Sequence, residues 1–158
     1  STHISAPYLV KQLPYDPRKD VTPITAAVDA VTVLAVNPSV PVTSVKELLE
    51  YLRKNPGKVS YGSAGVGNAF HLVGEIFQSS QGVSLLHVPY KGIVQAVQDT
   101  ASGQVNMVFS SVNNVIPLMK AGKLRVLSVI NPQRWSQLPD LPSAPETLPG
   151  FVRPHRQH

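Results

Sequence analysis

Runs of β-branched and apolar residues alternate with amphipathic helical stretches along most of this chain, and this alternation most constrains its fold. The first run, residues 30–36, is nearly continuous in its apolarity, as expected of a strand buried on both faces. Four similar runs follow, and we predict further strands at residues 59–61, 84–88, 105–109 and 124–130. Five strands separated by four helices are typical of an α/β domain with a mainly parallel sheet flanked by helices.

The helices between these strands carry recognisable end signals. Ser44 and Glu47 have the spacing of a capping box, and the residues behind them repeat apolar side chains at i, i+3, i+4 and i+7. Asn68 is a favoured N-cap type at the start of the second helix, which we expect to end before Gly82. Gly122 is predicted to be the C′ residue of the fourth helix.

Composition excludes several classes of protein. With 158 residues and a hydrophobic fraction of 42%, the chain can form one domain, or one domain and a fraction. The formal charge of +5 is spread thinly, so it favours an anionic small molecule weakly and predicts no nucleic-acid partner. There are no cysteines, which excludes disulfides and thiolate catalysis. No apolar run approaches the roughly 18 residues that span a bilayer.

A glycine-rich loop joins the predicted strand at 59–61 to the following helix. Gly62, Gly65 and Gly67 let the backbone turn tightly and approach a ligand closely, and Ser63 and Asn68 add short polar side chains. The helix that follows directs its first N–H groups and the positive end of its dipole into this loop. The loop therefore predicts a seat for a carboxylate or phosphate group.

Three enzymatic or cofactor interpretations of the loop match its residues less well than a seat for an anion does. Phe70 stands where a dinucleotide fingerprint needs its third glycine, and Gly67 lacks the following Lys and Ser/Thr of a phosphate-binding P-loop. We therefore expect no cofactor. A nucleophile elbow centred on Ser63 stays open as an alternative, although Tyr61 stands where its first glycine belongs. The available triad partners for such a hydrolase are His71, His87 and Asp99.

Two other predicted loops reach the same edge of the sheet, because the carboxyl ends of parallel strands lie together. They span residues 89–92, with Tyr90 and Lys91, and residues 109–114. His71 lies close enough to the glycine loop to reach a bound anion, and it can also pair with Glu75 on its own helix. A single His-x-x-x-Glu pair without further ligands does not predict a metal site.

The order of several motifs resembles the periplasmic solute receptors of tripartite tricarboxylate transporters, the Bug or TctC-type family. These motifs are Leu-Pro-Tyr-Asp-Pro at 13–17, Val-Leu-Ala-Val-Asn-Pro-Ser at 33–39, Tyr-Gly-Ser-Ala-Gly-Val-Gly at 61–67, His-Leu-Val-Gly-Glu-Ile-Phe at 71–77, His-Val-Pro-Tyr-Lys-Gly at 87–92, and Gly-Lys-Leu-Arg-Val-Leu-Ser-Val at 122–129. The resemblance reaches to about Phe151, and residues 152–158 depart from the family's pattern.

The resemblance implies one lobe of a two-lobed periplasmic binding protein, the Venus flytrap fold. Residues 1–29 would be a remnant of the first lobe, residues 30–130 the second lobe, and residues 131–158 a crossover back to the first lobe with an irregular tail. It also implies ligand contacts from the three loops. The implied ligand-binding residues are Ser63, Ala64, Gly65, Gly67, Asn68, His71, Tyr90, Lys91, Gly92, Phe109 and Ser110.

The family's function is to bind a small carboxylate, such as a di- or tricarboxylate or an amino acid, and present it to membrane transporter subunits without chemical change. The resemblance therefore implies a periplasmic receptor and no catalysis. Besides the hydrolase, a second alternative is a truncated fragment that binds no ligand and self-associates, for example as a homodimer.

Overall fold

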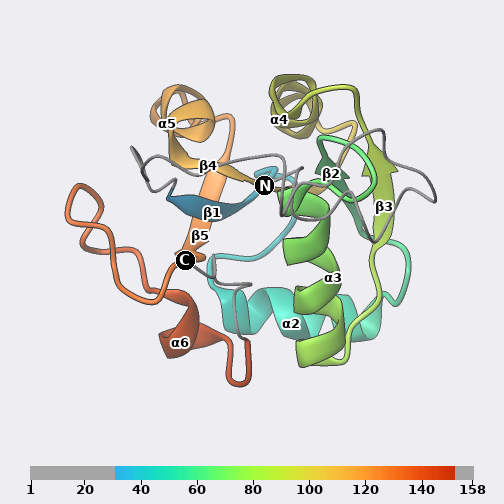
Figure 1. Cartoon of the computed structure of the whole chain (residues 1–158), viewed down its shortest axis with the longest axis horizontal. Coiled ribbons are helices and arrows are strands. Elements are labelled where there is room, and N and C mark those ends of the chain that lie inside the picture. Colours follow the sequence, from blue (N-terminus) through green and yellow to red (C-terminus); the bar gives the residue numbers. More distant parts are fainter. Residues whose placement is uncertain (1–30, 152–158) are drawn as a thin grey trace, which may run out of the picture.

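The computed structural model describes residues 31–151, which form one mixed β-sheet with helices on both faces (Figure 1). In chain order, the elements are β1 (Thr32–Val36), α2 (Val45–Lys54), β2 (Ser60–Ser63), α3 (Ala69–Gln81), β3 (Leu86–Pro89), α4 (Ile93–Ser102), β4 (Met107–Ser111), α5 (Val112–Lys120), β5 (Arg125–Val129) and α6 (Ala144–Thr147). All five predicted strands and four predicted helices are present, with ends shifted by at most two residues.

The sheet has the strand order β3-β2-β4-β1-β5. Strand β2 pairs in parallel with β3 and β4, while β1 pairs antiparallel with both β4 and β5. Four of the five strands therefore share one direction and β1 runs against them, so the sheet is mixed, with two parallel and two antiparallel strand pairs. The reversal of β1 was not predicted, because apolar patterning reports which faces of a strand are buried and carries no information on its direction.

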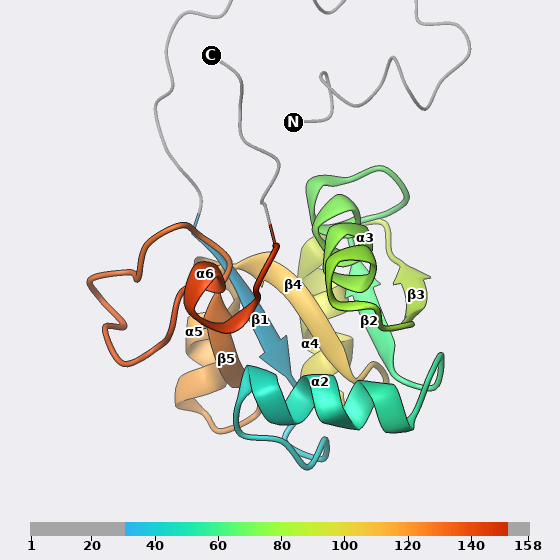
Figure 2. The ribbon, with the colours of Figure 1, turned by 90° about the horizontal axis from the view of Figure 1, so that it is seen from below.

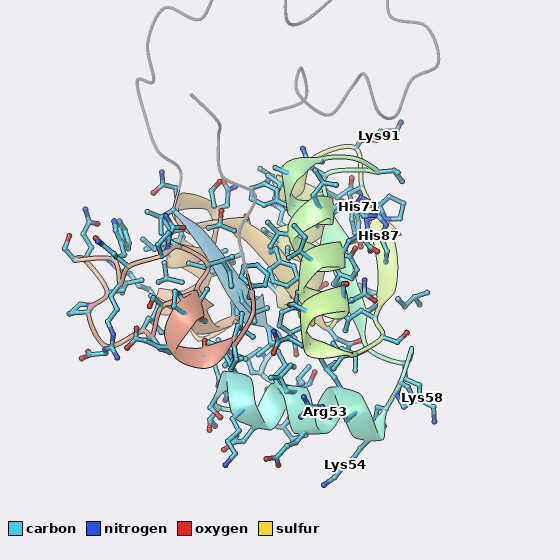
Figure 3. All side chains as sticks on the ribbon, turned by 60° about the horizontal axis from the view of Figure 1, so that its bottom comes forward. Arg53, Lys54, Lys58, His71, His87 and Lys91 are labelled. Atoms are coloured by element: carbon cyan, nitrogen blue, oxygen red, sulfur yellow. The ribbon has the colours of Figure 1, made fainter. Side chains whose placement is uncertain are left out.

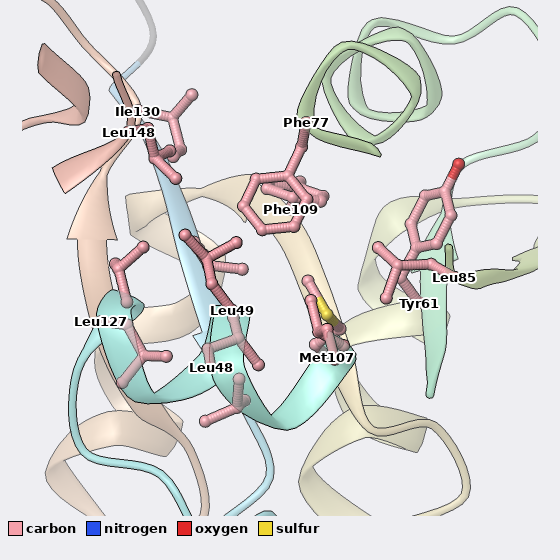
Figure 4. Packing of buried hydrophobic residues seen from close by; sticks show 14 of the residues in the cluster. Leu48, Leu49, Tyr61, Phe77, Leu85, Met107, Phe109, Leu127, Ile130 and Leu148 are labelled. Carbon is pink, nitrogen blue, oxygen red and sulfur yellow. The ribbon is translucent and has the colours of Figure 1, made fainter. Parts of the chain in front are cut away.

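The helices divide into two layers, one on each face of the sheet. Figure 1 shows α4 and α5 on one face and α2, α3 and α6 on the other. The larger core lies under the second group, where Phe77 of α3 packs against Phe109 of β4 with ring centroids 5.5 Å apart (Figure 4). The smaller core lies under α4 and α5 and includes Val97 and Val115. Strand β1 is buried on both faces, as its sequence predicts.

Most helix-end signals act as predicted. Asn68 caps α3 by accepting a hydrogen bond from the Phe70 amide, and Gly82 ends that helix in the left-handed conformation. Gly122 follows α5 with φ of +70°, as expected of a C′ glycine. Ser44 caps α2 by accepting from the Glu47 amide. The carboxylate of Glu47 reaches one residue further back than in a standard capping box, because it accepts from the amide and hydroxyl of Thr43.

The short helix α6 was not predicted. Ser143 and Glu146 form a capping box at its start, in which the Glu146 carboxylate accepts from both the amide and the hydroxyl of Ser143. Arg134 also donates to this carboxylate, at 2.6 Å between Nη2 and Oε1. Ser143 and Glu146 have the spacing of a capping box in the sequence, so the signal was available. The helix spans only four residues, too few for apolar periodicity to reveal it.

We expect Glu146→Gln to lower the melting temperature slightly at neutral pH. Hydrogen bonds from Arg134, and then from Ser143, lower the pKa of Glu146 to about 2 from its ordinary value of 4.5. A depressed folded-state pKa gives stability that is present above about pH 4.5 and is lost as the pH falls towards about 2. The difference between wild type and variant should therefore narrow across that range. Glu50→Gln, at an exposed position of α2, is the control for the loss of a surface carboxylate.

Several expectations concern residues outside the described part of the chain. The proposed first-lobe remnant at residues 1–29 and the departure from the family pattern at 152–158 both lie outside it. Within residues 31–151, no helix is long and apolar enough to cross a membrane. The elements β1 to β5 span residues 32–129, and α6 spans Ala144–Thr147. The division into a second lobe at 30–130 and a crossover at 131–158 stays a prediction.

Candidate functional site

The three predicted loops lie at one edge of the sheet. They follow β2, β3 and β4, which share one direction, so their carboxyl ends meet there. Because β1 is antiparallel, its first residues also lie at this edge, while α2 lies across the other end (Figure 2). Figure 2 also shows that the described chain begins and ends on this side. The candidate site therefore lies where this unit connects to the rest of the chain.

The glycine loop runs from Ser63 to Asn68 and is held by its own side chains. Gly65 and Gly67 have φ of +103° and +77°, in the region that residues with a Cβ rarely adopt. The Ser63 hydroxyl accepts a hydrogen bond from the Gly65 amide at 3.2 Å. The Gly67 amide donates to Nδ1 of His71 at 3.1 Å. Two amides expected to face an anion are therefore bonded within the loop and helix.

A cluster of aromatic and imidazole rings lies behind the loop, between α3 and β3. Figure 3 shows His71 and His87 next to each other, and their ring centroids are 4.3 Å apart. His87 also stacks on Tyr61, its partner in the parallel β2–β3 register, at 4.9 Å. Its Nε2 lies 2.7 Å from the Ser63 hydroxyl oxygen. Glu75 accepts a hydrogen bond from the Tyr61 hydroxyl at 2.8 Å and lies 3.7 Å from His71.

The electrostatics of this cluster follow from burial and neighbouring charges. Burial lowers the pKa of His87, and the neighbouring His71 adds to this effect, whereas Glu75 opposes it. Burial also raises the pKa of Tyr61, and its hydrogen bond to Glu75 raises it further. His87 is therefore neutral near pH 7 and Tyr61 stays protonated. Ser63, which is fully buried, thus bonds a neutral imidazole.

The second loop, residues 90–92, lies against the glycine loop. The Tyr90 amide donates to the Ser63 carbonyl at 3.0 Å, and a Cβ added to Gly65 would lie 3.4 Å from the Tyr90 carbonyl oxygen. Burial, followed by a hydrogen bond to Asp99, raises the pKa of Tyr90 to about 12. Lys91 is exposed and lies at the same end of the molecule as the two histidines (Figure 3). Gly92 is the N-cap of α4.

The third predicted contact differs from the expected turn. Phe109 and Ser110 lie inside β4, and α5 begins directly after that strand. The Phe109 ring is fully buried in the larger core, at 5.5 Å from Phe77, rather than on a wall facing the loops. Ser110 is also buried, and its hydroxyl accepts from Asn114 at 3.4 Å. The structure thus brings the first two loops together and directs these two side chains into the protein.

Residues 1–155 match the family described as the tripartite tricarboxylate transporter family receptor, TctC. The match spans nearly the whole chain, including the glycine loop and the cluster behind it. The chain belongs to the tripartite tricarboxylate transporter receptor family. It is also similar to BugT of Bordetella pertussis, with 30% identity over 145 residues that make up 91% of this chain and 44% of BugT.

Two solved structures share this fold. The R. palustris protein Rpa4515 with adipate superposes with a TM-score of 0.84 at 36% identity, covering 89% of this chain and 48% of that one. MatC of Rhodopseudomonas palustris with bound malate gives a TM-score of 0.84 at 27% identity, covering 95% of this chain and 51% of that one. The architecture is therefore a lobe of a periplasmic binding protein. The chain spans about half the length of these relatives.

In this TctC-type lobe, the Ser63 and His87 pair does not form a hydrolase site. Ser63 has no exposed surface, so no substrate carbonyl can reach its hydroxyl. Asp99, the predicted triad carboxylate, interacts with Tyr90 instead of orienting His87. Among the described residues, no group of three or more His, Asp or Glu side chains is arranged to hold a metal ion. The pair instead fixes the start of the glycine loop, because the Ser63 hydroxyl bonded to His87 also accepts from the Gly65 amide.

Sequence reasoning missed the linking role of His87. In the sequence, His87 is an available triad partner, and His71 and Glu75 are neighbours through their i, i+4 spacing. His87 faces Tyr61 because β2 and β3 pair in parallel with Tyr61 opposite His87. No signal within a few residues of His87 specifies that register. Tyr61 and His87 therefore meet only because β2 and β3 pair in this register.

Proposed function

We propose that this chain forms one lobe of a periplasmic receptor that binds a small carboxylate for a tripartite tricarboxylate transporter, without catalysis. Family membership supports the proposal, together with the adipate in the similar Rpa4515 structure and the malate bound by MatC. One structural observation carries it: the glycine loop at the start of α3 lies against the Tyr90–Gly92 loop at the sheet edge where the chain connects onward. Binding proteins of this class place ligands between lobes at such an edge.

The ligand carboxylate would be held mainly by main-chain donors. Because the amides of Gly65 and Gly67 already donate to side chains, we assign the carboxylate to the amides of Ala64, Val66 and Ala69. The positive end of the α3 dipole adds to their attraction. Asn68 holds the helix start in place through its cap, and Ser63 holds the loop from below.

The Tyr90–Gly92 loop would form the neighbouring wall. The partly exposed ring of Tyr90 stays protonated, because its pKa is raised to about 12, so it can donate a hydrogen bond or pack against a ligand chain. Lys91 would attract the acid as a solvated charge. Ser110 would contribute through its main chain, since its side chain is buried. Selectivity among acids would depend largely on the half of the relatives' length that this chain does not span.

Thermal stability in the presence of acids tests this function. We expect malate, adipate or a related di- or tricarboxylate to raise the melting temperature in a concentration-dependent way, since a ligand that binds only the folded state stabilises it. At 100 times the Kd, the gain is about 2.7 kcal/mol. If no acid in a panel of mono-, di- and tricarboxylates and acidic amino acids raises it, the proposal fails. Light scattering at several concentrations would then show whether the chain self-associates.

A matched pair of glycine variants separates loss of the site from loss of stability. Gly67→Val places a β-branched residue at φ +77° in the candidate loop, and Gly122→Val places one at φ +70° after α5, at the opposite edge of the sheet. Both should lower stability by about 1–3 kcal/mol. Only Gly67→Val should abolish the response to the acid. Equal responses in the two variants would remove the glycine loop from the site.

A further inference from the structure

The Gly67 amide is bonded to a side chain that can change its charge. It donates to Nδ1 of His71 at 3.1 Å, so this nitrogen carries a lone pair and no proton. The proton of the neutral ring is therefore on Nε2, the atom that lies 3.7 Å from Oε1 of Glu75. A protonated His71 would carry a proton on both nitrogens. Two N–H groups would then face each other, and the bond to Gly67 would break.

We propose that neutral His71 is a positioning residue that fixes the glycine loop through Gly67, and that protonation of His71 releases the loop. The loop and its partner are well placed for this role. Gly67 is buried, so water does not readily replace the lost acceptor. Gly67 also has a left-handed φ, which the loop must hold against other conformations open to glycine. The part of this proposal that concerns ligand affinity rests on the proposed function.

The charged and titratable groups around His71 decide which ring takes the first proton. His87 on β3 lies 4.3 Å away between ring centroids, and Glu75 lies on the same helix. Tyr61 on β2 bonds to Glu75 through its hydroxyl, and Lys91 lies beyond both histidines at the same end. Two imidazolium ions at such a distance repel strongly, so a single proton is shared by the pair. Oε1 of Glu75 lies 3.7 Å from Nε2 of His71, so a proton gained by the pair would have a counter-charge beside His71.

Burial also disfavours a proton on His87. Burial lowers the pKa of His87 and keeps this ring neutral, while its Nε2 remains bonded to the Ser63 hydroxyl. The Ser63 side of the loop therefore does not change between neutral and mildly acidic pH, and the Gly67 side does. Acid would loosen one half of the loop while the other half stays anchored. Carboxylate affinity should fall with acid, because the donors of a loosened loop must be ordered again on binding.

The amide signal of Gly67 tests the proposal without any ligand. In the full chain, we would follow this resonance by NMR from about pH 8 to about pH 5, the range in which histidine changes charge. The amide proton should move upfield along a single titration curve. Its exchange with solvent, corrected for the intrinsic pH effect, should become about fivefold to tenfold faster as the bond is lost. A flat signal over this range would overturn the proposal.

Two variants identify the group that titrates. His71→Asn places an amide oxygen near the position of Nδ1, keeping an acceptor for Gly67 that does not titrate, so the Gly67 signal should become flat. His87→Gln keeps a polar partner for Ser63, and the Gly67 titration should persist. If the signal still titrates in His71→Asn, or stops titrating in His87→Gln, His71 is not the switch.

A second measurement uses only the wild-type protein, so it applies even if a variant does not fold. The ring nitrogen shifts of wild-type His71 near pH 8 should show a protonated Nε2 and an unprotonated Nδ1, and the opposite tautomer would contradict the proposal. Calorimetric titration with malate and adipate then tests the link to binding, with affinity expected to fall as His71 is protonated and to fall less in His71→Asn. If no acid of the panel binds while Gly67 titrates as expected, the proposed function fails and the His71 switch stands.

Discussion

Replacing Phe109 with alanine is expected to lower the free energy of unfolding by about 3–5 kcal/mol. The ring is fully buried on the face of β4 that α3 covers. It lies 5.5 Å from the ring of Phe77 and 6.1 Å from that of Tyr61, in a tilted and an edge-to-face arrangement (Figure 4). Its removal leaves a cavity between strand and helix that neither neighbour can fill without leaving its own contacts.

Chemical denaturation measures this loss directly, and the melting temperature should fall by about 10 °C. Leu86→Ala is the control, because this side chain is 56% exposed and its truncation should change stability by less than about 0.5 kcal/mol. A loss below about 1 kcal/mol for Phe109→Ala would show that the ring does not lie in the core. It would then restore the interpretation that Phe109 faces the ligand.

Replacing Gly74 with alanine is expected to destabilise the protein by about 2 kcal/mol, although alanine is the better helix former by about 1 kcal/mol. Gly74 lies in α3 over the ring of Tyr61, and an added Cβ would overlap its Cε2 atom. Tyr61 cannot move aside easily. It is fully buried, stacked on His87, and bonded through its hydroxyl to Glu75.

A double-mutant cycle identifies this overlap as the cause. In a Tyr61→Leu background the ring is gone, so Gly74→Ala should become neutral or stabilising as helix propensity takes over. The coupling energy between the two positions should then be at least about 1–2 kcal/mol. Additive effects would mean that the helix and the ring do not meet. The glycine would then need another explanation.

The cluster beneath the glycine loop also links stability to the candidate site. Tyr61, His87 and Ser63 form a continuous path from the core to the loop, and His71 with Glu75 connects that path to α3. A change at Gly74 that displaces Tyr61 should therefore disturb the loop as well as the helix. The same amide of Gly67 that reports on His71 can report on this displacement.

Much of the local structure was predictable because its signals act over a few residues. Asn68 and Gly82 mark both ends of α3 through a side-chain cap and a left-handed backbone, and β1 shows its double burial in its own composition. The glycine loop was recognised from its residues alone. The capping box at Ser143 shows that even α6 has such a signal, although its four residues are too few for periodicity to support it.

The sequence by itself determined the strands, the helices, their ends and the position of the glycine loop, because backbone propensity, capping and burial periodicity are properties of neighbouring residues. Tertiary structure alone decided that β1 runs against the other strands, that Tyr61 lies opposite His87, and that Phe109 faces the core. It also decided that Gly67 donates to His71. These features depend on strand direction, sheet register and helix docking, which pair residues far apart in the chain and which no local pattern encodes.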